Sequence, residues 1–194
     1  MWQSLIQNIA KKGIILDEEE TSLLQSSFRI RQYKRNQFIL QQGDISRHES
    51  FVVSGLARMY LVDRNGRDHI VYFGIEDHWI GDLRSHYLEK PSDYNIECIE
   101  PTLVLQINKN ELEVLSEKIP KLTKFFLILY RNSIIWHESR TVSALSKTTL
   151  QRYQDFREKY AHLEQRVPLQ QIASYLGVTP QSLSRIRRQY QEKK

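Results

Sequence analysis

The sequence predicts an α+β fold: an antiparallel β-roll of the jelly-roll type, then a long helix, then a small helical domain. Three observations predict it. Five of the seven glycines fall between residues 43 and 81, at spacings of 12, 11, 8 and 7, and turn signals at such intervals are typical of a sandwich or barrel. The 47 residues between Pro120 and Pro168 contain neither Gly nor Pro, which favours long helices. Near the C-terminus, Gly177 separates two short segments with helical periodicity.

The roll is expected from about Phe28 to Ile107. Its clearest hairpin joins residues 58–62 to residues 69–73, and the Asn65-Gly66 pair between them suits the positive φ of a tight primed turn. Short apolar runs predict further strands at residues 38–40, 51–53 and 102–107, and residues 96–99 are also strand-like.

A long helix is expected to begin at Pro120, because a proline in the first turn loses no hydrogen bond. Apolar residues then recur at helical spacing: Leu122, Phe125, Phe126, Leu129, Trp136 and Val142. These are more than a small roll covers, so we interpret the helix as a dimer seam, with packing on the roll as the alternative. Residues 143–149, rich in Ser and Thr, predict its end. A second helix follows with one apolar face: Leu150, Tyr153, Phe156, Tyr160 and Leu163.

Residues 169–190 carry the most specific pattern of the chain, that of a helix-turn-helix. Pro168 precedes the first helix, Gly177 suits its left-handed end, and Thr179 with Pro180 suits the start of the second helix. A small residue, Ala173, stands where the two helices must cross. The positions that face inward are apolar: Ile172, Leu176, Val178, Leu183 and Ile186.

The second of these helices is predicted to read DNA. Since successive helical residues are rotated by about 100°, inward-facing Leu183 and Ile186 place polar side chains on the opposite face. Arg pairs bidentately with guanine and Gln with adenine in the major groove, whereas the helix start suits a phosphate. The alternative is a helical hairpin whose arginines are only solvated. The predicted DNA-binding residues are Thr179, Gln181, Ser182, Ser184, Arg185 and Arg188.

Charge and composition narrow the class of protein. The net charge is +5, yet residues 139–194 hold 11 Lys+Arg against 4 Asp+Glu, and such a basic block favours a polyanionic partner. The longest apolar run, residues 125–130, is far below the roughly 20 residues that span a bilayer. Lys11 and Lys12 follow the weakly apolar start, unlike a secretory signal. We therefore expect a cytoplasmic protein with no membrane partner.

In its order of parts the whole chain resembles the cyclic-AMP-receptor and fumarate–nitrate-regulator (Crp/Fnr) family of bacterial transcription factors. The resemblance rests on FVVSGLAR at residues 51–58, IGDL at residues 80–83 and IASYLGVTPQSLSRIRR at residues 172–188. It implies a cyclic nucleotide-binding-like sensor roll at residues 1–118, a dimerisation helix at 119–145 and a winged-helix-like helix-turn-helix domain at 146–194. Because only six residues follow Arg188, a β-wing would have to precede the motif or be absent.

The resemblance also implies how such a protein works. Family members are homodimers that bind double-stranded DNA at palindromic promoter sites and meet RNA polymerase there. Carried over by position, Gln181 and Arg185 are the expected base readers, with Thr179 and Ser182 near phosphates. Pro180 stands where some members have a base-reading arginine, so the half-site is expected to differ from theirs.

The sensor departs from the family's cyclic-nucleotide binders, whose phosphate cassette is Gly-Glu and, about ten residues on, Arg followed by Ser or Thr. Here Gly81 and Asp82 partly fit the first half, while Ser92 and Asp93 fall on the Arg-Ser positions. A phosphate needs a cation, and Asp93 would repel it, so we expect that the roll does not bind cyclic AMP. The alternatives are a cyclic nucleotide held through Arg84 and a different small effector.

No enzyme, metal or cofactor is expected. A cupin-like metalloenzyme is the alternative from another class, but the metal site of such an enzyme usually includes a closely spaced His pair, and this sequence has no His-x-His. The histidines are His48, His69, His78, His86, His137 and His162. Cys98, the single cysteine, excludes a disulfide framework and a Cys-rich metal or iron–sulfur centre, and we expect a buried thiol. Trp79, Tyr87 and Tyr94 belong to the core or to a ligand pocket. No nucleophile triad, Walker loop or dinucleotide fingerprint is present.

Overall fold

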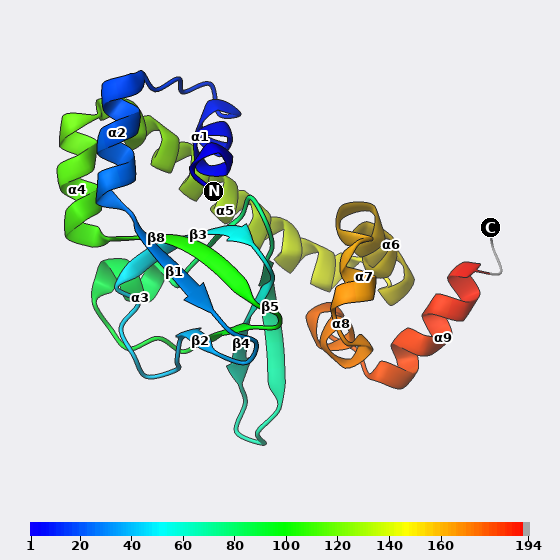
Figure 1. Ribbon diagram of the computed structural model, residues 1–194. Helices are drawn as coiled ribbons and strands as arrows, with labels where there is room; N and C mark the ends of the chain where they lie inside the picture. The colour runs from blue at the N-terminus through cyan, green and yellow to red at the C-terminus, as the bar shows by residue number, and fades with distance from the viewer. Residues whose placement is uncertain (192–194) are drawn as a thin grey trace. The chain divides into compact units, whose positions relative to one another are not determined.

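The computed structural model describes residues 1–191, and Figure 1 labels most of their elements. The last residues of the predicted helix-turn-helix domain, 192–194, lie outside the described residues. The chain forms two compact units: residues 1–61 with 72–131, and residues 62–71 with the chain from Asn132 on. The predicted α+β class, with a roll followed by helices, is confirmed.

The roll contains two four-stranded sheets with the orders β1-β8-β3-β6 and β2-β7-β4-β5, and only its hairpin tip at residues 62–71 belongs to the second unit. Apart from the hairpin of β4 and β5, neighbouring strands are not consecutive in the sequence, as in a roll. The strands are β1 (Arg29–Tyr33), β2 (Phe38–Leu40), β3 (His48–Ser54), β4 (Ala57–Val62), β5 (Asp68–Gly74), β6 (Trp79–Ile80), β7 (Asn95–Cys98) and β8 (Thr102–Asn108).

The alternation of side chains along β3 and β8 divides the core of the first unit. Val52 pairs with Val104 in the antiparallel register and both face the roll interior, where Ile80 and Ile96 also pack. Phe51 and Leu105 point to the opposite face of the sheet. That face is covered by α1 (Trp2–Ala10), α2 (Glu18–Ser27), α4 (Lys109–Lys118) and the beginning of α5 (Pro120–Ser146).

The hairpin of β4 and β5 forms where predicted, but its turn differs from the prediction. Only Gly66 of the Asn65-Gly66 pair has a positive φ, of 75°, so the predicted primed turn is wrong. The carboxylate of Asp63 accepts hydrogen bonds from the backbone N–H groups of Asn65 and Arg67 at 2.8 and 3.0 Å. These bonds stabilise an Asx-type turn in which Asn65 keeps a negative φ.

From α5 onward the described chain is helical. Thr148 caps α6 (Thr149–Tyr160) in a capping box with Gln151, which explains the break predicted from the Ser/Thr-rich stretch. Then follow α7 (Leu163–Arg166), α8 (Leu169–Leu176) and α9 (Pro180–Gln191). Residues 147–191 include no strand, so no wing strand lies between α5 and the helix-turn-helix. No helix in residues 1–191 has the length and apolar character that crossing a bilayer demands.

Candidate nucleic-acid interface and roll interior

The turn between α8 and α9 has the geometry that the motif requires. Gly177 ends α8 with φ of 69°, and its N–H and that of Val178 bond back to carbonyls of the last turn, Val178 to Ala173 at 3.0 Å. The hydroxyl oxygen of Thr179 accepts a hydrogen bond from the backbone N–H of Ser182 at 3.2 Å, which caps α9. The angle between the two helices is therefore set by local hydrogen bonds.

Helix α9 has one buried and one exposed face. Leu183 is fully buried and Ile186 is half-buried. The side chains predicted to face the solvent do so: Gln181, Ser184, Arg185 and Arg188 are exposed, as is Thr179, while Ser182 is half-buried. The hydroxyl of Ser184 donates to the carbonyl of Pro180 at 3.0 Å, so its proton is already used.

The arginines of α9 differ in their partners. Arg187 lies 3.9 Å from Glu164, whose carboxylate also binds Arg157 and the hydroxyl of Tyr153. Arg185 and Arg188 have no acidic partner among residues 1–191, and Arg185 makes only a long contact of 3.5 Å with Ser182. Two guanidinium groups on the exposed face thus carry uncompensated charge, which suits binding to a polyanion.

Two further contacts hold α8 in the second unit. Arg140 of α5 donates to the carbonyl of Tyr175 at 3.0 Å, and its guanidinium lies 3.9 Å from the centre of that ring. Ser174 donates to the carbonyl of Asp68 at 2.7 Å and accepts from the N–H of Ile70 at 3.0 Å. The tip of the β4–β5 hairpin therefore belongs to the same compact unit as the helix-turn-helix.

The long helix α5 buries fewer of its apolar side chains than the sequence contains. Phe125 and Phe126 are buried in the first unit and Leu129 packs against the same core, so at these positions the helix packs on the roll, as the alternative interpretation has it. Trp136 lies against Arg140 and His137. The large apolar residues of α5 that are exposed in the chain are Leu127, Ile134, Ile135, Val142 and Leu145.

The segment that matches the phosphate cassette is satisfied by its own side chains. Asp82, 5% exposed, caps α3 (Leu83–Leu88) by accepting from the N–H of Ser85 at 3.2 Å and accepts from the hydroxyl of Ser92 at 2.7 Å. Ser85 in turn accepts from the N–H of Ser46 at 2.9 Å and donates to the carbonyl of Lys90. The groups at these positions are thus already hydrogen-bonded to one another.

The cation that contacts this segment through Asp93 is also paired. Arg84 binds Asp93 at 2.7 Å, and both side chains are mostly exposed, 62% and 71%. Asp93 therefore neutralises the guanidinium that would have to replace the missing cassette arginine. Recruiting Arg84 to a phosphate would cost this ion pair.

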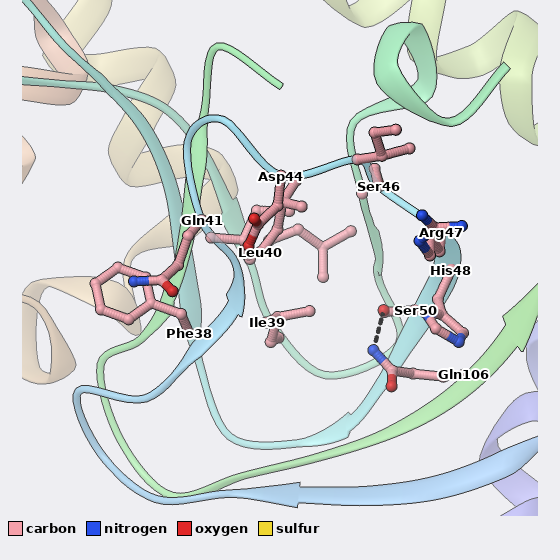
Figure 2. Close-up of a pocket in the computed structure, with 14 residues that line it drawn as sticks. Phe38, Ile39, Leu40, Gln41, Asp44, Ser46, Arg47, His48, Ser50 and Gln106 are labelled. Carbon is pink, nitrogen blue, oxygen red and sulfur yellow. Dashed lines mark hydrogen bonds between the residues drawn. The ribbon is translucent and has the colours of Figure 1, made fainter. Parts of the chain in front are cut away.

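A cavity of about 200 Å³ lies in the roll below β2 and the β2–β3 loop. Figure 2 shows Ser50 and Gln106 joined by a hydrogen bond of 2.9 Å from the amide of Gln106, with His48 of β3 beside them and with Asp44 and Arg47 on the β2–β3 loop. Ser50 and Gln106 are 1% and 5% exposed. The cavity is therefore polar at its inner end, although the strands around it are mostly apolar.

The remaining candidates for chemistry are dispersed. His69, His78 and His86 bond separately to the Asp63 carboxylate, the Glu76 carbonyl and the Ser46 carbonyl. No three His, Cys, Asp or Glu residues within 1–191 gather closely enough to hold a metal. Cys98 is fully buried, and burial raises the pKa of its thiol to about 11, so it lies in the core as an unreactive thiol. Trp79 packs among Phe28, Phe51 and Phe125.

Some polar residues of the roll were missed by the sequence reasoning. Glu49 and Ser50 precede the apolar run of β3, and Gln106 interrupts that of β8. Each is buried. The sequence did contain a signal for them, namely a polar residue inside or beside an apolar run. Without the register of the strands, however, that signal does not show which face of the sheet the residue occupies.

Comparisons with known proteins agree with this architecture. The family model of the cyclic nucleotide-binding domain matches residues 30–118. Among solved structures, FixK2 from Bradyrhizobium japonicum superposes with a TM-score of 0.76 at 18% identity, covering 86% of this chain and 85% of that chain. A CooA mutant from Carboxydothermus hydrogenoformans gives 0.73 at 15% identity, with 92% and 82% covered.

A third structure is the c-di-GMP responsive global regulator CLP of Xanthomonas campestris, with a TM-score of 0.72 at 11% identity over 91% of this chain and 93% of that chain. Identities this low establish the shared fold. A sequence search of curated proteins found no match.

Proposed function

We propose, from the premise that this chain contains a cyclic nucleotide-binding domain and has the fold of Crp/Fnr regulators, that it is a DNA-binding transcription regulator and not an enzyme. The exposed face of α9 carries the proposal. Gln181, Arg185 and Arg188 project from it without acidic partners among residues 1–191, and Leu183 fixes the opposite face in the domain core.

The chemistry of this face fits a DNA major groove. An arginine forms two hydrogen bonds to guanine and a glutamine two to adenine, so Arg185 and Gln181 are the proposed base readers. The N-terminus of α9, with Thr179 and Ser182, presents the backbone N–H of Gln181 and a positive dipole end to a phosphate. Ser184 and Arg188 complete the proposed contact surface.

The exposed residues of α5 support a homodimer. Leu127, Ile134, Ile135, Val142 and Leu145 follow one another at intervals of 7, 1, 7 and 3 residues, close to the heptad spacing of a helix–helix seam. A second copy of α5 would cover them, and a two-fold dimer reads a palindrome with half-sites about 10 base pairs apart. RNA polymerase at the same promoter is a further proposed partner.

The roll is proposed to act without cyclic AMP. Asp82 and Ser92 already bond to one another, and the guanidinium of Arg84 is paired with Asp93. The cavity of about 200 Å³ shares Phe38, Ile39 and Gln106 with an open hollow of about 760 Å³, so the proposal rests on these polar contacts and not on the size of the cavity. Its buried Ser50 and Gln106 favour a small polar effector as the alternative to a roll without ligand.

We expect millimolar cyclic AMP to leave the melting temperature of the protein unchanged, because a ligand raises it only by binding the folded state. Differential scanning fluorimetry with cyclic AMP and, as control, AMP at the same ionic strength tests this. A saturable rise with cyclic AMP alone would contradict the proposal and point to Arg84.

Selection from a random duplex pool with the purified protein tests the function itself. We expect enrichment of a palindrome whose half-sites are about 10 base pairs apart. The selection is run at low salt, where the phosphate contribution to affinity is strongest. No enrichment by the wild type, with the same background as a variant with Arg185→Ala and Arg188→Ala, would contradict DNA reading by the unliganded protein.

A further inference from the structure

A buried carboxyl lies below the long helix. Residues on β3 alternate between two faces, so Ser50 and Val52 point into the roll, whereas Glu49 and Phe51 point to the face covered by helices. Glu49 is only 3% exposed. Its Oε1 accepts a hydrogen bond of 3.2 Å from the hydroxyl of Tyr130 in α5. Its Oε2 lies close to Gly81, where a Cβ would come within 3.6 Å.

Tyr130 continues this contact toward the solvent. Its hydroxyl oxygen accepts a hydrogen bond of 2.9 Å from the hydroxyl of Tyr87 on α3, and the two rings meet edge to face at 5.8 Å. Tyr87 is 46% exposed. Glu49 on β3, Tyr130 on α5 and Tyr87 on α3 therefore form a continuous series of hydrogen bonds from a buried carboxyl group to the solvent.

The surroundings supply no cation to balance an ionised Glu49. Tyr130 is its one hydrogen-bond donor within the described part of the chain, and burial raises the pKa of Glu49 to about 7. Lys109 of α4 lies 6.0 Å from the Tyr87 ring and is paired with Glu89. The other titratable groups around this contact are Tyr87 and His86 on α3, Glu113 on α4, and His48 on β3.

The two histidines titrate below the range in which Glu49 does. Burial lowers the pKa of both His48 and His86 from the usual value, so both are neutral at pH 7. Burial also raises the pKa values of Tyr87 and Tyr130 above the usual 10. Of the three hydrogen-bonded side chains, Glu49 is thus the one that changes charge between pH 6 and 8.

We propose that Glu49, Tyr130 and Tyr87 form a proton-operated contact that sets how firmly α5 is held to the roll at the point where it leaves the first unit. Tyr130 lies one residue before the end of that unit, at Arg131, and α5 runs on unbroken to Ser146. With Glu49 neutral, its O–H donates to Tyr130, whose hydroxyl donates to Tyr87. With Glu49 ionised, both hydroxyls turn to donate toward the carboxylate, which remains a buried charge without a counterion.

The sign of the pH dependence follows from the direction of the shift. The pKa of Glu49 is higher in the folded protein than the 4.5 of the free group. The contact therefore has its full strength below pH 4.5 and loses it as the pH rises through about 7. We expect α5 to be held firmly at pH 6 and loosely at pH 8.

Hydrogen exchange of peptides that cover residues 127–134, read by mass spectrometry at pH 6 and 8, tests the proposal. After correction for the intrinsic pH effect, we expect opening of the wild type to rise about tenfold, as one proton lost at a pKa near 7 dictates. Glu49→Gln, which keeps the shape and stays neutral, should remain protected at both pH values. Glu113→Gln, an exposed change of the same charge on α4, should behave as the wild type.

An identical rise in Glu49→Gln would overturn the proposal. A second variant, Tyr130→Phe, tests the proposal even if Glu49→Gln fails to fold. Tyr130→Phe removes the hydrogen bond that favours the ionised carboxyl of Glu49. The midpoint of the exchange profile should then move to higher pH. An unmoved midpoint contradicts the role of Tyr130.

The consequence for DNA binding rests on the proposed function. Affinity for the selected duplex, measured at pH 6 and 8, should change with pH in the wild type and stay constant in Glu49→Gln. A protein that binds no duplex at either pH would contradict the proposed function and leave the exchange result standing. Equal pH dependence of affinity in both proteins would contradict the regulatory role of Glu49.

Discussion

The polar side chains of α9 differ in whether they already have a hydrogen-bond or ion-pair partner within the protein. Arg187 is engaged with Glu164, and the hydroxyl proton of Ser184 goes to a backbone carbonyl. Arg185 is exposed and has no acidic partner within residues 1–191. Its guanidinium is therefore available to a base without breaking an ion pair, whereas recruiting Arg187 would first break one.

Replacing Arg185 by alanine should weaken binding to the selected site by about 1–3 kcal/mol and relax the preference at one base pair. The loss arises because the two hydrogen bonds to a base disappear. Fluorescence anisotropy with the selected duplex and with single-base variants measures both effects.

Arg185→Lys separates base reading from charge, since lysine keeps the charge and lacks the planar fork. It should recover part of the affinity and little of the preference. Lys124→Ala, an exposed charge on the first-unit part of α5, is the control and should change neither. An Arg185→Ala protein with the wild-type sequence preference would show that another residue reads the base.

The exposed positions of α9 were predictable because helical rotation places them once Leu183 faces inward. Glu49 was not predictable in the same way. It is one residue from Ser50 in the sequence, yet the two point to opposite faces of the sheet, and only the register of β3 against β8 decides which face each takes. Its contact with Tyr130 joins residues 81 positions apart.

Among the elements, the connection of α8 to α9 depends most on one backbone conformation. Gly177 has φ of 69°, and no heavy atom lies within 4 Å of the place where a Cβ would be. Gly177→Ala should therefore cost about 1–2 kcal/mol of unfolding free energy through backbone strain alone. Urea unfolding followed by circular dichroism measures the loss.

Gly81→Ala is the matched control for this prediction. Gly81 has no positive φ, and an added Cβ would meet its neighbours only at 3.6 Å, an ordinary contact. Its unfolding free energy should stay close to that of the wild type. A Gly177→Ala protein as stable as Gly81→Ala would mean that the turn relaxes to a different geometry.

Elements with strong local signals were predictable, and the others depend on tertiary contacts. Pro120 marks the start of α5, and the capping box of Thr148 marks the start of α6. The start of α2 carries such a signal too, the capping box of Asp17 with Glu20, which the sequence reasoning did not use. The apolar faces of α1 and α2 find their partners only against Phe51 and Leu105 of the sheet. The turn at Asn65-Gly66 was mispredicted because the backbone N–H of Asn65 donates a hydrogen bond to the carboxylate of Asp63, and this bond fixes the backbone of the turn.

At the scale of the whole molecule, α5 leaves apolar side chains uncovered in the single chain. Ile134→Asp places a charge in the proposed seam, where two copies would bring like charges together. We expect a shift from dimer to monomer in analytical ultracentrifugation, with a loss of affinity for the full palindrome and less change for a half-site.

Ile15→Asp serves as the control for that shift. Ile15 is 69% exposed, comparable to the 60% of Ile134, and lies outside α5. It should leave the oligomeric state unchanged. A wild-type protein that is monomeric at micromolar concentration would contradict the seam before any variant is made.

The order of parts was predictable at this scale, but the covered side of α5 was not. Helical periodicity finds the apolar positions of α5 without saying which neighbour covers each one. Phe125 and Leu129 pack on the first unit, whereas Leu127, between them in the sequence, is 67% exposed. The division depends on α1, α2 and α4, which arrive from distant parts of the chain.

The contact between Ser174 and the hairpin tip has a consequence for how the protein is made. Asp68 and Ile70 precede Ser174 by 106 and 104 residues, so their partner is synthesised long after the roll strands on either side of them. In a nascent or truncated chain the N–H of Ile70 is hydrogen-bonded to water. It donates to Ser174 only once α8 has folded. Its exchange rate thus reports the completion of the C-terminal unit from a position within the sequence of the N-terminal one.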